Sequence, residues 1–141
     1  MDKRTKIIMS QVMLPSQANV AGNVHGGEIM KLMDTAAGAV AKKYSRSNVV
    51  TARVDELQFH LPIFVGALVT LSATVAYVGR TSMEVIVTVD VEDLESDTEP
   101  KRALSSYFTM VALDKAGRPR EILKLQPETE EEKVLYEEIK R

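Results

Sequence analysis

Apolar and polar side chains alternate in two neighbouring segments of the chain. In residues 67–78 every second position is apolar, and the positions between them carry mostly Thr, Ser and Ala. Residues 83–91 repeat the pattern, with methionine and valines on one parity and mainly charged residues or threonine on the other. Because antiparallel sheets commonly bury one face only, this alternation predicts two half-exposed strands joined by a hairpin at residues 79–82.

A third segment, VVTARVDELQFHL at residues 49–61, changes phase partway along. The apolar positions from Val50 to Val54 are even-numbered, whereas those from Leu57 onward are odd-numbered. A β-bulge inserts one residue and shifts the side-chain parity by one, so a bulge near 55–56 is expected in this strand.

Two more segments favour β-structure. Residues 6–14, KIIMSQVML, are mostly β-branched or apolar and end at a proline. Residues 102–114, RALSSYFTMVALD, carry apolar residues on both parities, which predicts a central strand buried on both faces. The polar segment between this strand and the preceding one predicts a solvated loop.

One long helix is predicted from Gly26 to about Tyr44, because this segment is rich in strong helix formers and has lysines in its last turn. Its polar residues form only a narrow stripe on a helical wheel, so we expect it to be largely enclosed. A short, charged C-terminal helix follows Thr129, which has capping-box spacing to Glu132. The predicted fold class is α+β, with a five-stranded antiparallel sheet wrapped around one central helix.

The composition favours one domain spanning residues 1–141, which is long enough to bury a core. Net charge is −2, and acidic and basic residues are interspersed, which argues against nucleic acid or a membrane surface as the main partner. The charged start lacks the apolar run of a signal peptide, and no segment approaches the roughly 20 apolar residues that span a bilayer. A cytoplasmic location is expected.

Metal and cofactor chemistry are not expected either. The chain has no cysteine, so thiol catalysis and disulfides are excluded. Its two histidines, His25 and His60, lie far apart in the sequence without a carboxylate at ligand spacing, whereas a catalytic zinc needs three protein ligands. No glycine-rich phosphate loop of the Walker or Rossmann type is present.

The segment NVAGNVHGGEIMKLMD, residues 19–34, carries the candidate chemistry. Gly22, Gly26 and Gly27 allow the backbone to approach another molecule closely. Gly26 and Gly27 stand at the predicted helix start, where free N–H groups and the positive end of the helix dipole attract developing negative charge. Those are the requirements of an oxyanion hole.

Three polar residues of this segment have two interpretations each. Asp34 belongs either to the polar stripe of the helix or to a partly buried flank, where a carboxylate is hydrogen-bonded or serves as a base. Asn19 and Asn23 suit turns and caps as well as substrate contacts. His25 is expected to anchor the loop rather than to act as a base.

Helix geometry constrains how this segment works. Gly27 and Asp34 are seven residues apart, which separates them by about 10 Å along one helix. Both therefore cannot reach one reacting carbonyl from the same chain. If both act on one substrate, Asp34 must come from a second subunit across a two-fold axis.

The same segment matches the pattern N-x-x-G-x-x-H-G-G-x(6)-D and so resembles the hotdog-fold acyl-CoA thioesterases. The segments VVTARVDELQFHLPI, GRTSMEV, SSYFTMVALDKAGRP and LQPETEEEK resemble the branch that contains the cytosolic and brain-type acyl-CoA hydrolases and their short bacterial relatives. Together these segments cover nearly the whole chain.

This resemblance implies a five-stranded sheet around one helix, a homodimer with one continuous sheet, and often a trimer of dimers. By position, the family's catalytic aspartate corresponds to Asp34 and its substrate-placing asparagine to Asn19. The helix-start amide corresponds to Gly27, with Gly26 and His25 beside it as substrate-binding residues. A symmetric dimer would then hold two active sites, each built from both subunits.

The implied reaction is hydrolysis of acyl-CoA to CoA and a free acid, without a metal or cofactor. Asp34 serves either as general base or as nucleophile, and the sequence leaves both routes open. The resemblance places the nucleotide end of CoA near the turn GRTS. There Arg80 offers charge, and Thr81 and Ser82 offer donors, although an arginine in a hairpin is often simply solvated.

Three other functions fit a fold of this kind. Hydratases and dehydratases of this fold usually pair a histidine with an acidic residue, and the predicted helix has no second histidine. A non-catalytic acyl-CoA sensor usually carries a DNA-binding segment, for which the 18 residues before Asn19 are too few. A purely structural oligomer is the remaining alternative.

Overall fold

The computed structural model describes residues 3–125, 127 and 129–140. The first two residues of the charged start, and residues 126 and 128 of the segment QPETEEEK, lie outside the described residues. Five strands form one antiparallel sheet in the order β1-β3-β4-β5-β2. The strands are β1 (Lys6–Val12), β2 (Asn48–Val54), β3 (Leu68–Val78), β4 (Ser82–Glu92) and β5 (Lys101–Leu113), and the helices are α1 (Gly26–Ser45) and α2 (Glu130–Lys140).

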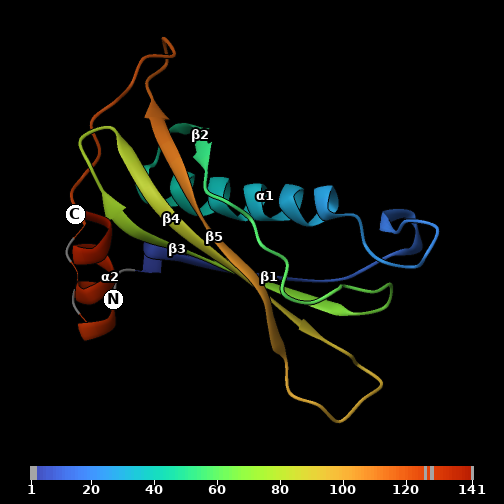
Figure 1. Cartoon of the computed structure of the whole chain (residues 1–141). Helices are drawn as coiled ribbons and strands as arrows, with labels where there is room; N and C mark the ends of the chain where they lie inside the picture. Colours follow the sequence, from blue (N-terminus) through green and yellow to red (C-terminus); the bar gives the residue numbers. More distant parts are fainter. Residues whose placement is uncertain (1–2, 126, 128, 141) are drawn as a thin grey trace.

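Helix α1 lies across one face of the twisted sheet and contacts all five strands (Figure 1). The inward positions of β3, β4 and β5 alternate with half-exposed ones, as the sequence pattern predicts. Burying one Val or Leu side chain stabilises a fold by about 1.5–3 kcal/mol, so this interface supplies much of the driving force. The largest completely buried side chains among the described residues are those of Phe108, Met13, Ile29, Met33, Leu71, Met83 and Leu104.

Helix α2 packs on β3, where the rings of Tyr77 and Tyr136 lie 4.8 Å apart between centroids. The predicted capping box at its start is confirmed. The Glu132 backbone N–H donates to Thr129 Oγ1 at 3.1 Å, and the Thr129 N–H donates to Glu132 Oε1 at 2.9 Å. These reciprocal bonds satisfy donors that the helix start would otherwise leave free.

The predicted bulge near 55–56 is wrong in position. The register of β2 against β5 shifts between Thr51 and Arg53, and β2 ends at Val54. Residues 55–61 have no regular secondary structure. The change in apolar parity beyond Val54 therefore occurs in a segment that is no longer paired in the sheet. Because the bulge flips parity at position 52, Thr51 and Val54 pair with the inward-facing Met110 and Phe108, whereas Val50 is exposed.

The prediction that 102–114 is buried on both faces is also wrong. In β5 one face is buried and the other is half-exposed. A register shift between β4 and β5 leaves Ala103 unpaired, so that Ala103 and its neighbour Leu104 are both buried. This bulge explains the buried pair at 103 and 104, whereas the other odd-numbered apolar residues, Tyr107, Val111 and Leu113, are half-exposed on the outer face.

On the outer face of the sheet, β4, β5 and the end of β2 carry a polar cluster. The hydroxyl of Thr109 hydrogen-bonds both carboxylate oxygens of Glu84, at 2.8 and 3.0 Å. Burial raises the pKa of the Glu84 carboxyl, and the Thr109 bond acts in the opposite direction. Because Glu84 precedes the inward-facing Val85, this cluster faces away from α1 and from the segment with candidate chemistry.

The C-cap of α1 is Arg46, which has a left-handed backbone with φ of 56° and is the only such residue other than glycine in the described part of the chain. A left-handed conformation costs a residue with a Cβ about 1–2 kcal/mol. We therefore expect Arg46→Gly to raise the free energy of unfolding by about 0.5–1 kcal/mol, after allowing for the extra freedom of glycine in the unfolded chain. Urea unfolding measures it. Arg46→Ala keeps the Cβ and serves as the control, and equal stability of both variants would contradict the explanation.

Candidate active site

The loop before α1 is organised by Asn19. The Asn19 side-chain oxygen accepts the backbone N–H groups of Ala21 and Asn23, at 2.9 and 3.1 Å. Its backbone N–H donates to the Asn23 carbonyl at 2.8 Å, and Gly22 occupies the left-handed conformation that this turn requires, with φ of 87°. Since the oxygen is used within the turn, the side-chain amide of the exposed Asn19 is the group that is available to donate to a ligand.

The start of α1 is open. His25 is the N-cap, and its side chain makes no capping hydrogen bond. The N–H groups of Gly26 and Gly27 have no acceptor among the described residues, whereas those of Glu28 and Ile29 reach the His25 carbonyl. A Cβ on Gly27 would meet nothing within 4 Å. The helix therefore presents free donors and its positive dipole end to solvent, as anion stabilisation requires.

A cavity of about 350 Å³ brings part of the predicted site together. It is lined by Asn19, Asn23, Val24, Gly26, Phe59, His60, Leu61, Pro62 and Ile63. The Phe59 ring lies 3.5 Å from where a Cβ of Gly26 would stand, so this ring forms a wall beside the helix start. Sequence reasoning did not select His60, because only the folded loop brings it near Asn19.

The anchoring role predicted for His25 is carried by its backbone, whose N–H donates to the Gln17 carbonyl at 2.9 Å. Its side chain is exposed and is absent from the lining of the cavity. The imidazole therefore faces solvent in the single chain, next to the open helix start.

Asp34 lies outside this cavity, on the exposed side of α1. Its Oδ1 accepts a hydrogen bond of 2.6 Å from the hydroxyl of Thr51 on β2. In the single chain Asp34 thus belongs to the polar stripe, not to a buried flank. Thr51 was not found by sequence reasoning, because the bulge in β2 decides that it faces α1.

The surroundings of Asp34 form the edge of the sheet. β2 is the last strand, so one side of its backbone has no neighbouring strand. Val50 on this strand is 45% exposed, and Met30 on the adjacent part of α1 is 39% exposed. An unpaired edge strand with apolar neighbours is a surface on which another copy of a chain can add.

The turn with Arg80, Thr81 and Ser82 lies apart from the loop of Asn19. It closes the β3–β4 hairpin, whereas the Asn19 loop lies at the start of α1 and toward the other end of β3 (Figure 1). Backbone bonds tie the turn to the segment after β5: Ala112 N–H donates to the Thr81 carbonyl at 3.0 Å, and Ile122 N–H to the Arg80 carbonyl at 2.9 Å. Within one chain, the predicted site residues therefore lie in three separate regions: the Asn19 loop with the start of α1, the surroundings of Asp34, and the turn at residues 79–82.

The residues that the structure describes contain no group of three or more His, Cys, Asp or Glu side chains placed to hold a metal ion. Neither α1 nor α2 combines the length and apolar character that a membrane-crossing helix needs.

The chain belongs to the Thioesterase superfamily, whose family model matches residues 21–97. It is 42% identical over 127 residues to the cytosolic acyl coenzyme A thioester hydrolase of Mus musculus, in an alignment that covers 89% of this chain and 33% of that protein. The chain thus spans about a third of the length of this relative. The predicted family and the hotdog fold are confirmed.

Solved structures agree. An apo-hexameric acyl-CoA thioesterase superposes with a TM-score of 0.92 at 37% identity, over 98% of this chain and 88% of that one. The acyl-CoA hydrolase of Staphylococcus aureus in complex with butyryl coenzyme A and coenzyme A gives 0.88 at 32% identity, over 96% and 82%. Three single-alanine variants of the S. aureus protein are similar as well. One replaces an asparagine, one replaces an aspartate 15 residues after that asparagine, and one replaces a threonine 17 residues after that aspartate.

Proposed function

We propose that this protein hydrolyses acyl-CoA to CoA and a carboxylic acid, in active sites shared between two copies of the chain. The observation that carries the proposal is that one helix, α1, has both an open, uncapped start and a carboxylate, Asp34, further along it. Thr51 on β2 holds this carboxylate by a hydrogen bond. The names of the mouse relative and of the S. aureus hydrolase support the substrate class. The hexameric relative supports an oligomer, here a trimer of dimers.

The shared site follows from the separation within α1. Gly27 and Asp34 are about 10 Å apart along the helix, too far to contact one carbonyl together. Pairing of β2 with β2 of a second copy would continue the sheet and satisfy its unpaired edge. The two α1 helices would then run antiparallel, so that each Asp34 lies near the partner's helix start.

In the proposed reaction the N–H groups at Gly26 and Gly27 receive the thioester oxygen, and Asn19 positions the substrate or water through its free amide. Asp34 of the other copy removes a proton from water as the water oxygen attacks the carbonyl carbon. The tetrahedral oxyanion is stabilised by the helix start. Its collapse breaks the carbon–sulfur bond, and the thiolate of CoA leaves and is protonated. Alternatively, Asp34 attacks first and water cleaves the resulting anhydride.

The proposal needs no metal or cofactor, because a thiolate is a good leaving group. The spacing of Asn19, Asp34 and Thr51 supports the assignment, since the three alanine variants of the S. aureus hydrolase stand at positions with the same spacing. The word cytosolic in the name of the mouse relative supports the predicted cytoplasmic location.

The direct test is the release of free thiol from acyl-CoA substrates of increasing chain length, followed with DTNB. We expect turnover with at least one chain length. Binding of acyl-CoA without turnover across the whole panel would contradict hydrolysis and favour the alternative, a non-catalytic acyl-CoA sensor.

Thr51→Ala tests how Asp34 is positioned. A hydrogen bond to a charged group contributes about 1.5–3 kcal/mol. If the variant loses part of this hydrogen-bond energy in the transition state, kcat is expected to fall by about tenfold with little change in KM. Thr70→Ala is the matched control, because it removes a threonine hydroxyl that bonds Ser10 at 3.0 Å elsewhere on the sheet. Equal kcat values for the two variants would show that Thr51 does not position Asp34.

A further inference from the structure

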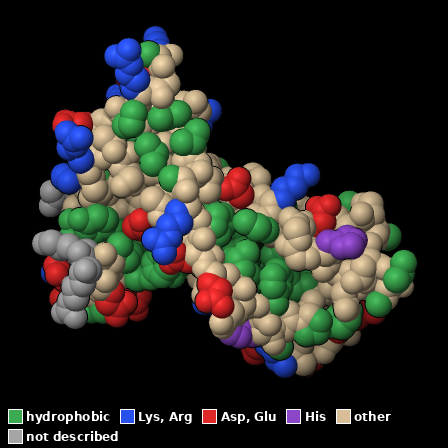
Figure 2. Space-filling view, turned by 45° about the horizontal axis from the view of Figure 1, so that its top comes forward, with side chains coloured by type: hydrophobic (Ala, Val, Ile, Leu, Met, Phe, Trp, Pro, Cys, Tyr) green, Lys and Arg blue, Asp and Glu red, His purple; other side chains and the backbone are tan. Residues whose placement is uncertain are grey.

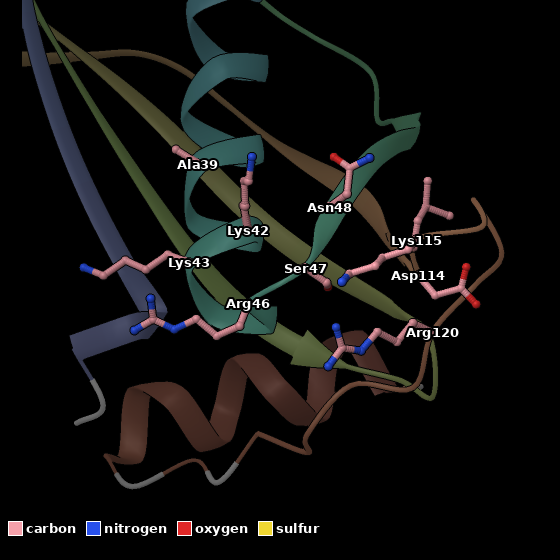
Figure 3. A pocket seen from close by; sticks show the side chains of 10 residues that line it. Ala39, Lys42, Lys43, Arg46, Ser47, Asn48, Asp114, Lys115 and Arg120 are labelled. Atoms are coloured by element: carbon pink, nitrogen blue, oxygen red, sulfur yellow. The ribbon is translucent and has the colours of Figure 1, made fainter.

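Strands β2 and β5 pair beside α1, and the end of α1 leads directly into this pairing. Helix α1 ends at Ser45 and β2 begins at Asn48, which Figure 3 shows beside the last turn of the helix, at the rim of a cavity of about 740 Å³. Lys and Arg side chains gather at this end of the molecule, where the segment after β5 projects (Figure 2), but in Figure 3 they extend in different directions rather than toward one point. The contact that bears on Asp34 lies further along β2, at Thr51.

The hydroxyl of Thr51 lies between two acceptors. Asp34 Oδ1 is 2.6 Å from Thr51 Oγ1, and the thioether sulfur of Met110, Sδ, is 3.5 Å from the same oxygen. A hydroxyl has only one proton to donate, and a thioether sulfur is a weak acceptor. While Asp34 is ionised, the carboxylate therefore holds this proton, because hydrogen bonds to charged groups are about twice as strong as neutral ones. The sulfur then touches the hydroxyl without receiving its proton.

The pairing of the two strands fixes this contact. Thr51 and Met110 stand directly opposite each other in the register of β2 against β5, and the bulge in β2 follows Thr51. The Cβ atoms of such opposite residues are about 4.5–5.5 Å apart, and a β-branched threonine has few side-chain rotamers. The sulfur therefore stands beside the hydroxyl because of the strand register.

The two acceptors lie in different surroundings. Asp34 and Thr51 are exposed, whereas Met110 is only 2% exposed, and Met83, its partner on β4, is completely buried. Water thus has access to the carboxylate, while the sulfur belongs to the core. A leucine at position 110 would fill nearly the same volume. Because leucine has no lone pair to accept a proton, packing alone does not account for a methionine in contact with this hydroxyl.

The proposed reaction changes what the Thr51 hydroxyl needs. When Asp34 acts as general base, it takes a proton from water and loses its negative charge. A protonated carboxyl is a weaker acceptor than a carboxylate, and it has a proton of its own to donate. The hydroxyl then needs another acceptor if it is to receive this proton. Among the described residues, Met110 Sδ is the only other acceptor of the Thr51 hydroxyl.

We propose that Met110 is a positioning residue, whose sulfur receives the Thr51 hydroxyl proton while Asp34 is protonated. With Asp34 ionised, the hydroxyl donates to Oδ1. With Asp34 protonated, the hydroxyl turns toward Sδ and accepts from the carboxyl, so Thr51 stays hydrogen-bonded to Asp34 in both states. The proton taken from water remains on Asp34 throughout, and only hydrogen bonds change at Thr51 and Met110. This inference rests on the proposed function, with Asp34 as the base.

Met110→Leu tests the role of the sulfur. We expect kcat for acyl-CoA hydrolysis to fall by about threefold with KM unchanged. This is less than the loss expected for Thr51→Ala, because Met110 acts through Thr51. Met83→Leu is the matched control, since it makes the same exchange at a neighbouring buried position and its kcat should equal that of the unmodified protein. Equal kcat values for the two leucine variants would overturn the proposal.

A double variant separates positioning from packing. If Met110 acts only through the Thr51 hydroxyl, Thr51→Ala/Met110→Leu should have the same kcat as Thr51→Ala alone. A further threefold loss in the double variant would show that Met110 acts by packing, and would reject the inference while leaving the hydrolase assignment intact. Absence of turnover by the unmodified protein is a different result, because it would reject the hydrolase assignment itself and this inference with it.

A measurement without turnover follows the sulfur directly. The protein is labelled with ¹³C in its methionine methyl groups, and the signal that disappears in Met110→Leu is assigned to Met110. Asp34→Asn replaces the carboxylate by a neutral amide, so the hydroxyl proton should move toward Sδ and shift this signal. In a Thr51→Ala background the same change at Asp34 should leave the signal in place. If the Met110 signal does not move when Thr51 is intact, the sulfur does not serve as the second acceptor.

Discussion

Asp34→Ala is expected to lower kcat for acyl-CoA hydrolysis by about 10²–10⁴-fold, the usual contribution of a positioned general base. Nucleophilic attack by Asp34 would give a loss at least as large. Since Asp34 is exposed on α1 and, among the described residues, its side chain hydrogen-bonds only the Thr51 hydroxyl, its removal should leave the fold, the assembly and CoA binding intact. Turnover is measured as thiol release with DTNB, and CoA binding by calorimetry.

Two companion variants sharpen this result. Asp34→Asn keeps an oxygen that can accept the Thr51 bond but removes the negative charge, so a similar loss shows that the charge itself is needed. Asp97→Ala removes an exposed aspartate on the loop between β4 and β5 and should turn over normally. Undiminished turnover by Asp34→Ala would reject the proposed role of this residue.

The second large effect is expected when two inactive proteins are mixed. Asn19→Ala and Asp34→Ala protomers each lack one half of the proposed site, so each homodimer is inactive. In a mixed dimer, one site combines the intact Asn19 loop of one chain with the intact Asp34 of the other. Random exchange at equal concentrations makes half of the dimers mixed, each with one active site, so about a quarter of the original activity should return.

This experiment needs proof that the subunits exchange, which differently tagged protomers and co-purification provide. Asn19 also organises its own loop through its side-chain oxygen, so Asn19→Asp is a useful second variant that keeps the acceptor and removes the amide donor. No recovery after verified exchange would show that Asn19 and Asp34 do not belong to a site shared in this way.

The fold followed from the sequence wherever the signal is local. The strict alternation in β3 and β4 and the helix formers after Gly26 gave elements that agree with the structure to within one or two residues. The capping box at Thr129 and the glycines at the start of α1 were found for the same reason. In each case the chemistry lies within a few residues, and the backbone conformation follows from it.

The positions of the bulges were not predicted correctly, because they depend on how neighbouring strands pair. Whether Thr51 or Val50 faces α1 depends on the register of β2 against β5, and position 52 sets that register. A slip of one residue exchanges the two faces of a strand, so parity counted along one segment does not settle it.

The sequence by itself determined the class of fold, the open helix start beside Asn19, and the fact that Gly27 and Asp34 cannot meet within one chain, because each depends only on spacing along a strand or a helix. Only the tertiary structure decided that Thr51 holds Asp34 and that His60 and Phe59 stand beside the helix start. These contacts join segments that are distant in the sequence. Their geometry is set by how the sheet twists around α1, and no local pattern encodes it.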